Sequence, residues 1–301
     1  MSDKHNAGDV PTTGHIWDDD LADYTNQPPK WWMLGLTASA LFVVVYWLWY
    51  PSVPVTTANG FFKGIGGWTA IGEMEADMKV VDERRKEWES DIKNKTPAEI
   101  LAVERLTKYS LASGKVLFGD NCAACHGTNG VGTRDKLGLF APILNDDDWL
   151  YGGTIGAIHV SIVSGRQGMM MAHEGMLTDA QIGTLANAVA AGKPTSTPLF
   201  AESGCTACHG EDGKGMAAMG SANLTDKVGR FYKTDGDNAD SADAILASIK
   251  YTIKHGVNAG SPETRAAVMP SFQAAGKLSD DEMKKLAVYV YKFGGGQPDA
   301  Q

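Results

Sequence analysis

The stretch "NCAACHGTNG", residues 121–130, holds two of the chain's four cysteines three positions apart, and a histidine follows them at once. The same pattern returns in "GCTACHGEDG", residues 204–213. The residues of the two copies are Cys122, Cys125 and His126 in the first and Cys205, Cys208 and His209 in the second. Because no cysteine is left over, one chemistry must account for both copies.

Each position of this Cys-x-x-Cys-His pattern has a function if the ligand is haem. Two thiols three residues apart share one helical turn, so both can form thioether bonds with the vinyl groups on one haem edge. The next residue then lies beneath the iron, where its imidazole is the proximal ligand. The pattern is the attachment signature of c-type haem. The sequence therefore predicts two covalently bound haem c groups, with His126 and His209 as axial ligands of the irons.

Three other uses of paired cysteines fit the pattern less well. A zinc site with four cysteine ligands also needs two Cys-x-x-Cys pairs, but its linker is typically much shorter than the one between residues 125 and 205. A thioredoxin-like dithiol is expected in a βαβ context, which the sequence does not show. A structural disulfide needs no histidine directly after the second cysteine.

Length and charge narrow the class of protein. A chain of 301 residues suggests about two domains besides any anchor. The net charge of −9 and the isoelectric point near 5.2 argue against nucleic-acid binding, which requires a basic surface. A small domain has difficulty burying enough apolar surface by itself, and a haem at its centre supplies a large apolar body.

One stretch is suited to crossing a membrane. Residues 31–50, "WWMLGLTASALFVVVYWLWY", contain no charge and have the length that a bilayer requires. Aromatic residues lie at both ends, as in the belts at the level of the lipid headgroups, and Pro51 and Pro54 end the helix. A cleaved signal peptide would have a shorter apolar region behind a basic leader, whereas the leader here is long and acidic. The sequence thus predicts an uncleaved anchor.

The orientation of this anchor follows from the haem motifs. Too few lysines flank the span for the positive-inside rule to decide. Bacterial c-type haems are attached outside the cytoplasmic membrane, so we expect residues 1–30 in the cytoplasm and the single-pass helix in the bacterial inner membrane. Everything after Pro51 is then periplasmic, beginning with a linker over residues 51–107 that contains an amphipathic helix.

Two segments, residues 108–192 and 195–295, repeat one plan. Each begins with a short helix that leads into the haem motif and ends with an amphipathic helix that starts at a capping box. The core-facing positions of these closing helices are Ile182, Leu185 and Val189 in the first and Met283, Leu286 and Val290 in the second. The sequence thus predicts a mainly α protein, with a single N-terminal transmembrane helix followed by two tandem cytochrome c-type haem domains.

An iron that relays electrons needs a second axial ligand, and a methionine raises its potential where a second histidine would lower it. Cytochrome c domains usually present this methionine just before their final helix. In "AAVMPSF", Met269 precedes Pro270, which stiffens the loop. In "GRQGMMMA", alignment on a Gly-Arg-x-Gly-x-Met-Pro-Ala pattern selects Met170, with Met169 and Met171 as alternatives. The spare histidines of the two haem segments are His159, His173 and His255.

The leader carries a more specific pattern than the haem motifs. Residues 12–32, "TTGHIWDDDLADYTNQPPKWW", place a Gly-His-x-Trp-Asp stretch before an asparagine, prolines and a Trp-Trp pair. The matching residues are Gly14, His15, Trp17, Asp18, Asn26, Pro29, Trp31 and Trp32. Followed by one span and two haem motifs, this leader resembles the CcoP (FixP) subunit family of cbb3-type cytochrome c oxidases, over essentially the whole chain.

The resemblance implies a non-catalytic electron-transfer subunit of a proton-pumping oxidase. Such a subunit accepts electrons from a periplasmic cytochrome c donor or from quinol–cytochrome c reductase. It passes them to the monohaem c subunit and thence to the haem-copper catalytic subunit, which reduces oxygen to water. Two other classes stay open: a free-standing, membrane-anchored dihaem shuttle between other respiratory complexes, and a dihaem peroxidase with an open sixth position at one iron.

Which methionine serves which iron is not decided by the residues alone. A local arrangement pairs His126 with Met170 and His209 with Met269. The resemblance implies the other arrangement, in which the two domains pack face to face and exchange their methionines. His126 then pairs with Met269, and His209 with Met170.

Overall fold

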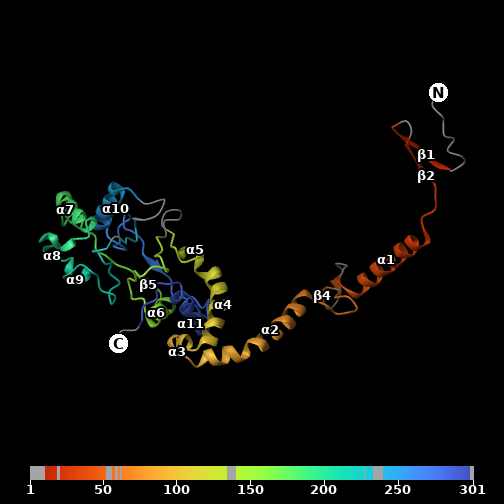
Figure 1. Cartoon of the computed structure of the whole chain (residues 1–301), viewed down its shortest axis with the longest axis horizontal. Helices are drawn as coiled ribbons and strands as arrows, with labels where there is room; N and C mark the ends of the chain where they lie inside the picture. Colours follow the sequence, from red (N-terminus) through yellow and green to blue (C-terminus); the bar gives the residue numbers. More distant parts are fainter. Residues whose placement is uncertain are drawn as a thin grey trace. The chain divides into compact units, whose positions relative to one another are not determined.

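The computed structural model describes most of the chain, and helices predominate over strands (Figure 1). The residues fall into two compact units, Met1–Arg84 and Arg85–Gln301, and each is described by itself. The described residues are 11–18, 21–51, 56–57, 60–61, 63–133, 140–226, 228–232 and 240–298.

The first unit contains two short antiparallel strand pairs and a long apolar helix. The pairs are β1 (Thr12–Trp17) with β2 (Leu21–Tyr24) and β3 (Thr56–Thr57) with β4 (Gly60–Phe61). Helix α1 (Lys30–Trp49) has no buried residue. Among the residues that the structure describes, it is the one helix long and apolar enough to cross a membrane, which agrees with the span predicted for residues 31–50.

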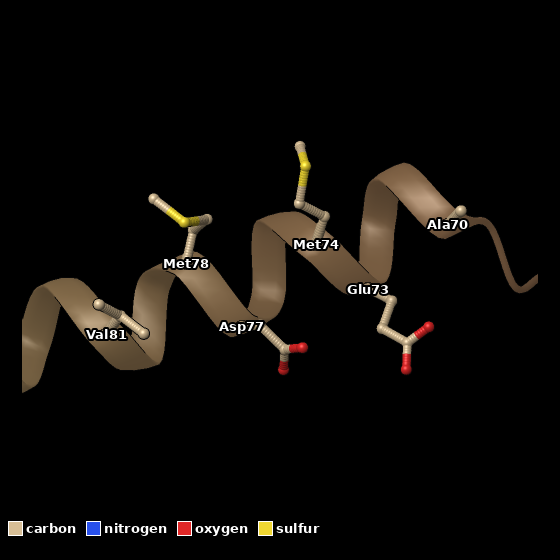
Figure 2. A pocket seen from close by; sticks show the side chains of 6 residues that line it. All are labelled: Ala70, Glu73, Met74, Asp77, Met78 and Val81. Carbon is tan, nitrogen blue, oxygen red and sulfur yellow. The ribbon is translucent and has the colours of Figure 1, made fainter. Parts of the chain in front are cut away.

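Helix α2 (Ala70–Lys93) lies where the sequence predicts an amphipathic helix. Its last part packs on the protein itself: Ile92 is fully buried, and Trp88 stacks on Tyr109 with 5.7 Å between ring centres. Its first part carries a shallow groove, lined by Ala70, Glu73, Met74, Asp77, Met78 and Val81. Figure 2 shows the two methionines pointing to one side of the helix and the two carboxylates to another. Both methionines are exposed, so the apolar stripe is buried only over its second half.

The second unit is built from short helices around the two haem motifs. The helices are α3 (Pro97–Ala102), α4 (Glu104–Asn121), α5 (Ala123–His126), α6 (Ile155–Ser164), α7 (Asp179–Ala190), the 3-10 turn η1 (Pro194–Ser196), α8 (Leu199–Glu202), α9 (Thr206–His209), α10 (Ala242–His255) and α11 (Asp280–Tyr291). The strands are β5 (Arg166–Gln167) and β6 (Val268–Met269). The predicted mainly α class is confirmed.

Both closing helices, α7 and α11, begin at the predicted capping boxes. Thr178 accepts a hydrogen bond from the backbone N–H of Gln181, whose side chain accepts one from the backbone N–H of Thr178. Ser279 and Glu282 form the same pair of bonds. These bonds satisfy N–H groups that the first helical turn leaves without partners. The predicted core positions are buried except for Val189, which is partly buried: they are Ile182, Leu185, Met283, Leu286 and Val290.

The two closing helices pack on opposite halves of the unit. Helix α11 lies against α4 and α6, which precede and follow the first haem motif, and α7 lies against α10 and α8 near the second (Figure 1). The buried residues of the first core are Phe118, Ile158, Ile162, Leu278, Met283, Leu286, Ala287 and Val290. A helix of the second sequence repeat therefore completes the apolar core around the first motif.

The two sequence repeats are joined by short backbone pairings. Strands β5 and β6 pair antiparallel, with Arg166 opposite Met269. Farther along, Met170 and Val257 exchange two N–H···O bonds of 2.9 Å. The two domain ranges expected from the sequence follow the repeat along the chain and stay a prediction. In the packing, the closing helix of each repeat lies on the other repeat: α11 lies on α4 and α6, and α7 lies on α10 and α8.

Candidate haem-binding sites

The first motif lies on a short helical turn at the end of α4. Cys122 joins α4 to α5, and Gly127 ends the turn in the left-handed region, with a φ of +74°. Cys122 is partly buried, Cys125 is exposed, and neither is in a disulfide. The Nδ1 atom of His126 lies 2.9 Å from the carbonyl oxygen of Pro142.

The second motif repeats this geometry. Cys205 precedes α9, and Gly210 ends the turn at a φ of +80°. Cys205 is again partly buried, and Cys208 exposed, without a disulfide. The Nδ1 atom of His209 lies 2.9 Å from the carbonyl oxygen of Ala222.

In both sites the imidazole is oriented as a metal ligand must be. Because Nδ1 faces a carbonyl oxygen, it carries the ring proton and donates it, which leaves Nε2 unprotonated. Burial lowers the pKa of His126 and of His209 and outweighs the carbonyl bonds, which raise it, so both rings are neutral at pH 7. Each site therefore offers two thiols and one neutral, oriented imidazole, which is the donor set of a c-type haem site.

The two cysteine pairs are not gathered into one metal site. In the described part of the chain, no three His, Cys, Asp or Glu side chains are arranged to hold a metal ion. Burial raises the pKa of the Cys122 thiol to about 11 and also raises the pKa of Cys205. Each pair thus stands alone as a partly buried thiol beside an exposed one, which suits two separate attachments rather than one zinc site with four cysteines.

The candidate methionines differ in their exposure. Met169 and Met171 are 82% and 62% exposed, whereas Met170 between them is partly buried. Met269 is also partly buried, and it packs against the core cluster that Cys122 contacts. Of the three consecutive methionines, Met170 is therefore the one directed into the fold, and its role as an iron ligand stays a prediction.

Each of the two methionine loops packs closely against a glycine at the end of one helix. Gly165 ends α6 at a φ of +69°, and a Cβ atom on it would lie 2.5 Å from the carbonyl oxygen of Met269. Gly256 ends α10, also at +69°, and the carbonyl oxygen of Met170 approaches it as closely. Glycine alone tolerates both this conformation and this approach. Met269 is thereby held beside the helix that follows the first motif, and Met170 beside the helix that follows the second.

Two of the three spare histidines, His173 and His255, make contacts of their own in the half that contains α10. His255 Nδ1 lies 3.4 Å from a Glu174 carboxylate oxygen, and its ring lies against Tyr251. His173 is 7% exposed, and its backbone N–H bonds to the carbonyl of Ile253 on α10. These contacts give both residues packing roles in the half that contains α10.

The structure also shows site residues that the sequence does not reveal. Pro142 and Ala222 accept the histidine hydrogen bonds through their backbone carbonyls, 16 and 13 positions after His126 and His209. Every residue has a carbonyl, so no sequence pattern marks these two. Arg230 is a second case: its Nε donates to the carbonyl of Phe140 at 2.8 Å, two residues before Pro142.

Two oriented Cys-x-x-Cys-His sites define a dihaem cytochrome of the c type, and the same chain has one helix long and apolar enough to cross a membrane. Comparison with protein families agrees along the chain: the N-terminal domain of cytochrome oxidase-cbb3, FixP, matches residues 9–57, subunit III of the cbb3-type cytochrome c oxidase matches 110–187, and cytochrome c matches 197–293. The chain belongs to the FixP/CcoP family of cbb3-type cytochrome c oxidase subunits.

Curated relatives match the chain from end to end. The cbb3-type cytochrome c oxidase subunit FixP of Bradyrhizobium sp. (strain ORS 278) is 32% identical over 98% of this chain and 99% of its own length. FixP of Azorhizobium caulinodans is 33% identical over 97% and 95%. CcoP of Cereibacter sphaeroides is 29% identical over 98% of both.

These comparisons confirm the family resemblance seen in the leader and the predicted cofactor. The two cytochrome c domains carry covalently bound haem c, and the chain takes part in electron transfer within a cbb3-type oxidase. Its partners are other subunits of that oxidase. The apolar helix α1 suits a membrane anchor.

Proposed function

We propose that this subunit receives electrons from a periplasmic cytochrome c donor or from quinol–cytochrome c reductase and relays them through its two haems. The acceptor is the monohaem c subunit, from which electrons reach the haem-copper subunit that reduces oxygen. The observation that carries the proposal is the pair of matching motifs whose methionine loops and closing helices are interlocked in one compact unit. Such interlocking keeps two redox groups at a fixed separation.

The geometry of the two sites supports the following residue roles in this proposal. Cys122 and Cys125 form the thioether bonds of one haem c, and His126 is its proximal ligand; the equivalent residues of the second motif are Cys205, Cys208 and His209. When bound, the haem supplies an iron that accepts and returns one electron. The carbonyls of Pro142 and Ala222 hold the imidazoles in the ligating tautomer. Met170 and Met269 would each supply a sulfur ligand to a haem iron, and such a ligand would raise the potential of that iron.

The methionines are exchanged in this proposal. His126 pairs with Met269, and His209 with Met170. The support is reciprocal: Met269 packs with Cys122 against the core of α4, α6 and α11, while Met170 shares backbone hydrogen bonds with Val257 beside α10.

A chain with one haem distinguishes exchange from local ligation. The variant with Cys205→Ala and Cys208→Ala keeps only the attachment site of the first haem. In that background Met269→Leu should abolish the near-infrared charge-transfer band between thioether sulfur and iron, and Met170→Leu should leave it. The opposite result would establish local pairing.

The membrane orientation is tested separately. We infer that residues 1–30 are cytoplasmic and that both haem domains are periplasmic. Alkaline phosphatase fused after Gln301 should then be active, whereas a fusion confined to residues 1–30 should be inactive. The reverse pattern of activity would overturn this topology.

The relay itself is tested in solubilised membranes. The chain should co-purify with the monohaem and haem-copper subunits, and electrons from reduced cytochrome c should pass through it to oxygen. Met269→Leu should slow this passage, because the haem that loses its sulfur ligand has a lower potential. A chain that purifies alone, with both haems reducible by cytochrome c, would indicate the free-standing shuttle instead.

A further inference from the structure

Two partly buried arginines lie around one aromatic ring close to the first haem site. The guanidinium carbon of Arg230 is 5.7 Å from the centre of the Phe231 ring, and that of Arg265 is 4.6 Å from the same ring. Arg265 also lies 5.0 Å from the ring of Tyr251 and 5.6 Å from the ring of Phe140. Aromatic faces attract cations, but they do not neutralise their charge.

The hydrogen bonds of the two guanidinium groups end on neutral atoms. Arg230 Nε donates to the Phe140 carbonyl at 2.8 Å, and Arg265 donates to the Ser248 hydroxyl at 2.9 Å. The Nε of Arg265 is buried and has no acceptor. Within the described ranges, neither guanidinium has a carboxylate partner. Burial lowers the pKa of both arginines, since the charged form loses hydration.

This arrangement is costly unless an anion accompanies it. A guanidinium stays protonated in proteins, so both groups keep their charge. Two like charges that share one ring repel each other, and withdrawing a charge from water without a counter-ion is unfavourable. An orphaned N–H donor adds to that cost. Among the described residues, the cluster therefore has the composition of a carboxylate site without its carboxylate.

The position of the cluster indicates which carboxylate. The segment from Phe140 to Pro142 offers one carbonyl to Arg230 and another to His126. The charge of Arg230 is close enough to His126 to contribute to the lowered pKa of that ring. A haem c at the first motif would bring two propionate carboxylates into this half of the protein. An arginine fork matches such a carboxylate with two parallel hydrogen bonds.

We propose that Arg230 and Arg265 bind a propionate of the haem attached at Cys122 and Cys125. The proposal rests on the attachment site proposed above. Both arginines follow the second motif in the chain, so the second repeat supplies the first haem with a counter-charge as well as with a methionine. Because the two arginines offset the negative charge of the propionate, they favour the reduced iron and raise the reduction potential of the first haem.

Redox titration of the full-length dihaem chain in detergent tests this role. Arg230→Gln with Arg265→Gln should keep both haems by haem staining and lower one of the two midpoint potentials, leaving the other unchanged. We expect a change on the order of tenfold in the ratio of oxidised to reduced iron at fixed potential, as for one unit charge at close range in a protein interior. Arg105→Gln is the matched control, because Arg105 pairs with Glu87 and Asp91 on the surface.

Three further measurements decide the outcome. Arg230→Lys with Arg265→Lys keeps the charge and loses the fork, so it should lower the same potential by less; it also serves if the glutamine variant does not fold. Redox-difference infrared spectra should show a propionate carboxylate band that moves in both variants. Unchanged potentials with both haems retained would overturn the proposal, and so would wild-type potentials that respond to inorganic phosphate, because the site would then bind a free anion.

The proposed attachment is checked independently of the arginines. If the chain with Cys205→Ala and Cys208→Ala carries no stainable haem, the attachment at the first motif is wrong and the propionate assignment falls with it. If that chain stains but the arginine variants leave its potential unchanged, the attachment stands and the propionate assignment alone is wrong.

Discussion

The two haem sites have the same local geometry and different surroundings. Each histidine meets a backbone carbonyl at 2.9 Å, and each turn ends at a glycine in the left-handed region. Around the first site, Phe118, Tyr289 and Phe293 pack ring against ring, with centres 4.9 to 5.7 Å apart. The apolar interior of the second half includes Phe200, Ile182, Leu185 and Ile249. Each histidine is thus oriented in the same way, by a backbone carbonyl that follows its motif, while the elements that cross between the repeats determine the environment.

The largest expected effect comes from separating the repeats. Residues 1–192 and 193–301, made as separate chains, each lack the closing helix and the methionine loop of the other. We expect both fragments to lose the thioether-to-iron charge-transfer band completely. Co-expression of the two fragments is the control, since it should restore the band by reassembly. Bands that persist in both isolated fragments would show that each repeat is self-sufficient.

Core truncations should act on the opposite repeat. Leu286 is fully buried on α11, and Leu185 is 2% exposed on α7. Truncation of either to alanine should lower the free energy of unfolding by about 2–5 kcal/mol, as for other buried leucines. Because α11 packs on α4 and α7 on α10, Leu286→Ala should increase hydrogen exchange in α4, and Leu185→Ala in α10.

Exchange measured by mass spectrometry localises these effects. The decisive comparison is between α4 and α10 within each variant. If Leu286→Ala loosened α10 and spared α4, the packing would follow the order of the repeats in the chain and the crossing would be wrong.

The glycine substitutions should have a smaller, more local effect. Alanine at Gly165 or Gly256 must adopt a positive φ, at a cost of about 1–2 kcal/mol, and its Cβ displaces the opposite methionine loop. Each variant should therefore lose the charge-transfer band of one haem and keep that of the other. Gly119→Ala on α4 is the control, because nothing lies within 4 Å of its added Cβ. Loss of neither band would show that these loops do not carry the ligands.

The smallest expected effect is on the pH dependence of stability and comes from one partly buried carboxylate, Asp148. Burial raises the pKa of Asp148 to about 6, with further contributions from the charges of Asp226, Asp146 and Asp147. The folded chain then binds a proton more tightly than the unfolded chain, so stability increases as the pH falls through about 6. Asp148→Asn should stabilise the fold at pH 8 by on the order of 1 kcal/mol and have no effect near pH 3.

Urea unfolding over this pH range measures the effect. Asp120→Asn, at an exposed position of α4, provides the control. A constant difference between Asp148→Asn and the wild type at every pH would exclude titration of Asp148 as the cause.

Much of the fold is predictable because its signals are local. The apolar run that forms α1, the capping boxes at Thr178 and Ser279, and the two haem motifs all depend on neighbouring residues. The choice of Met170 as a ligand rests on a short pattern and stays a prediction, although Met170 is less exposed than Met169 and Met171.

What the sequence does not predict depends on contacts between distant segments. Periodicity shows that α11 buries Leu286 but not that its partner is α4, because any apolar surface satisfies the pattern. The carbonyls that orient the histidines are backbone atoms and leave no trace in residue type. The arginine cluster is assembled from Arg230, Arg265 and Phe140, which no local motif connects.

The crossing of the closing helices has a consequence for biosynthesis. The first haem motif is made early, but α11, which covers it, is among the last segments to leave the ribosome. During that interval the cysteines of the first motif are accessible to whatever attaches haem, and the apolar face of α4 is uncovered. A chain that ends prematurely, even after both motifs, keeps this face exposed. We therefore expect proteases to remove incomplete chains, so that those which survive to join the oxidase are complete to the last helix.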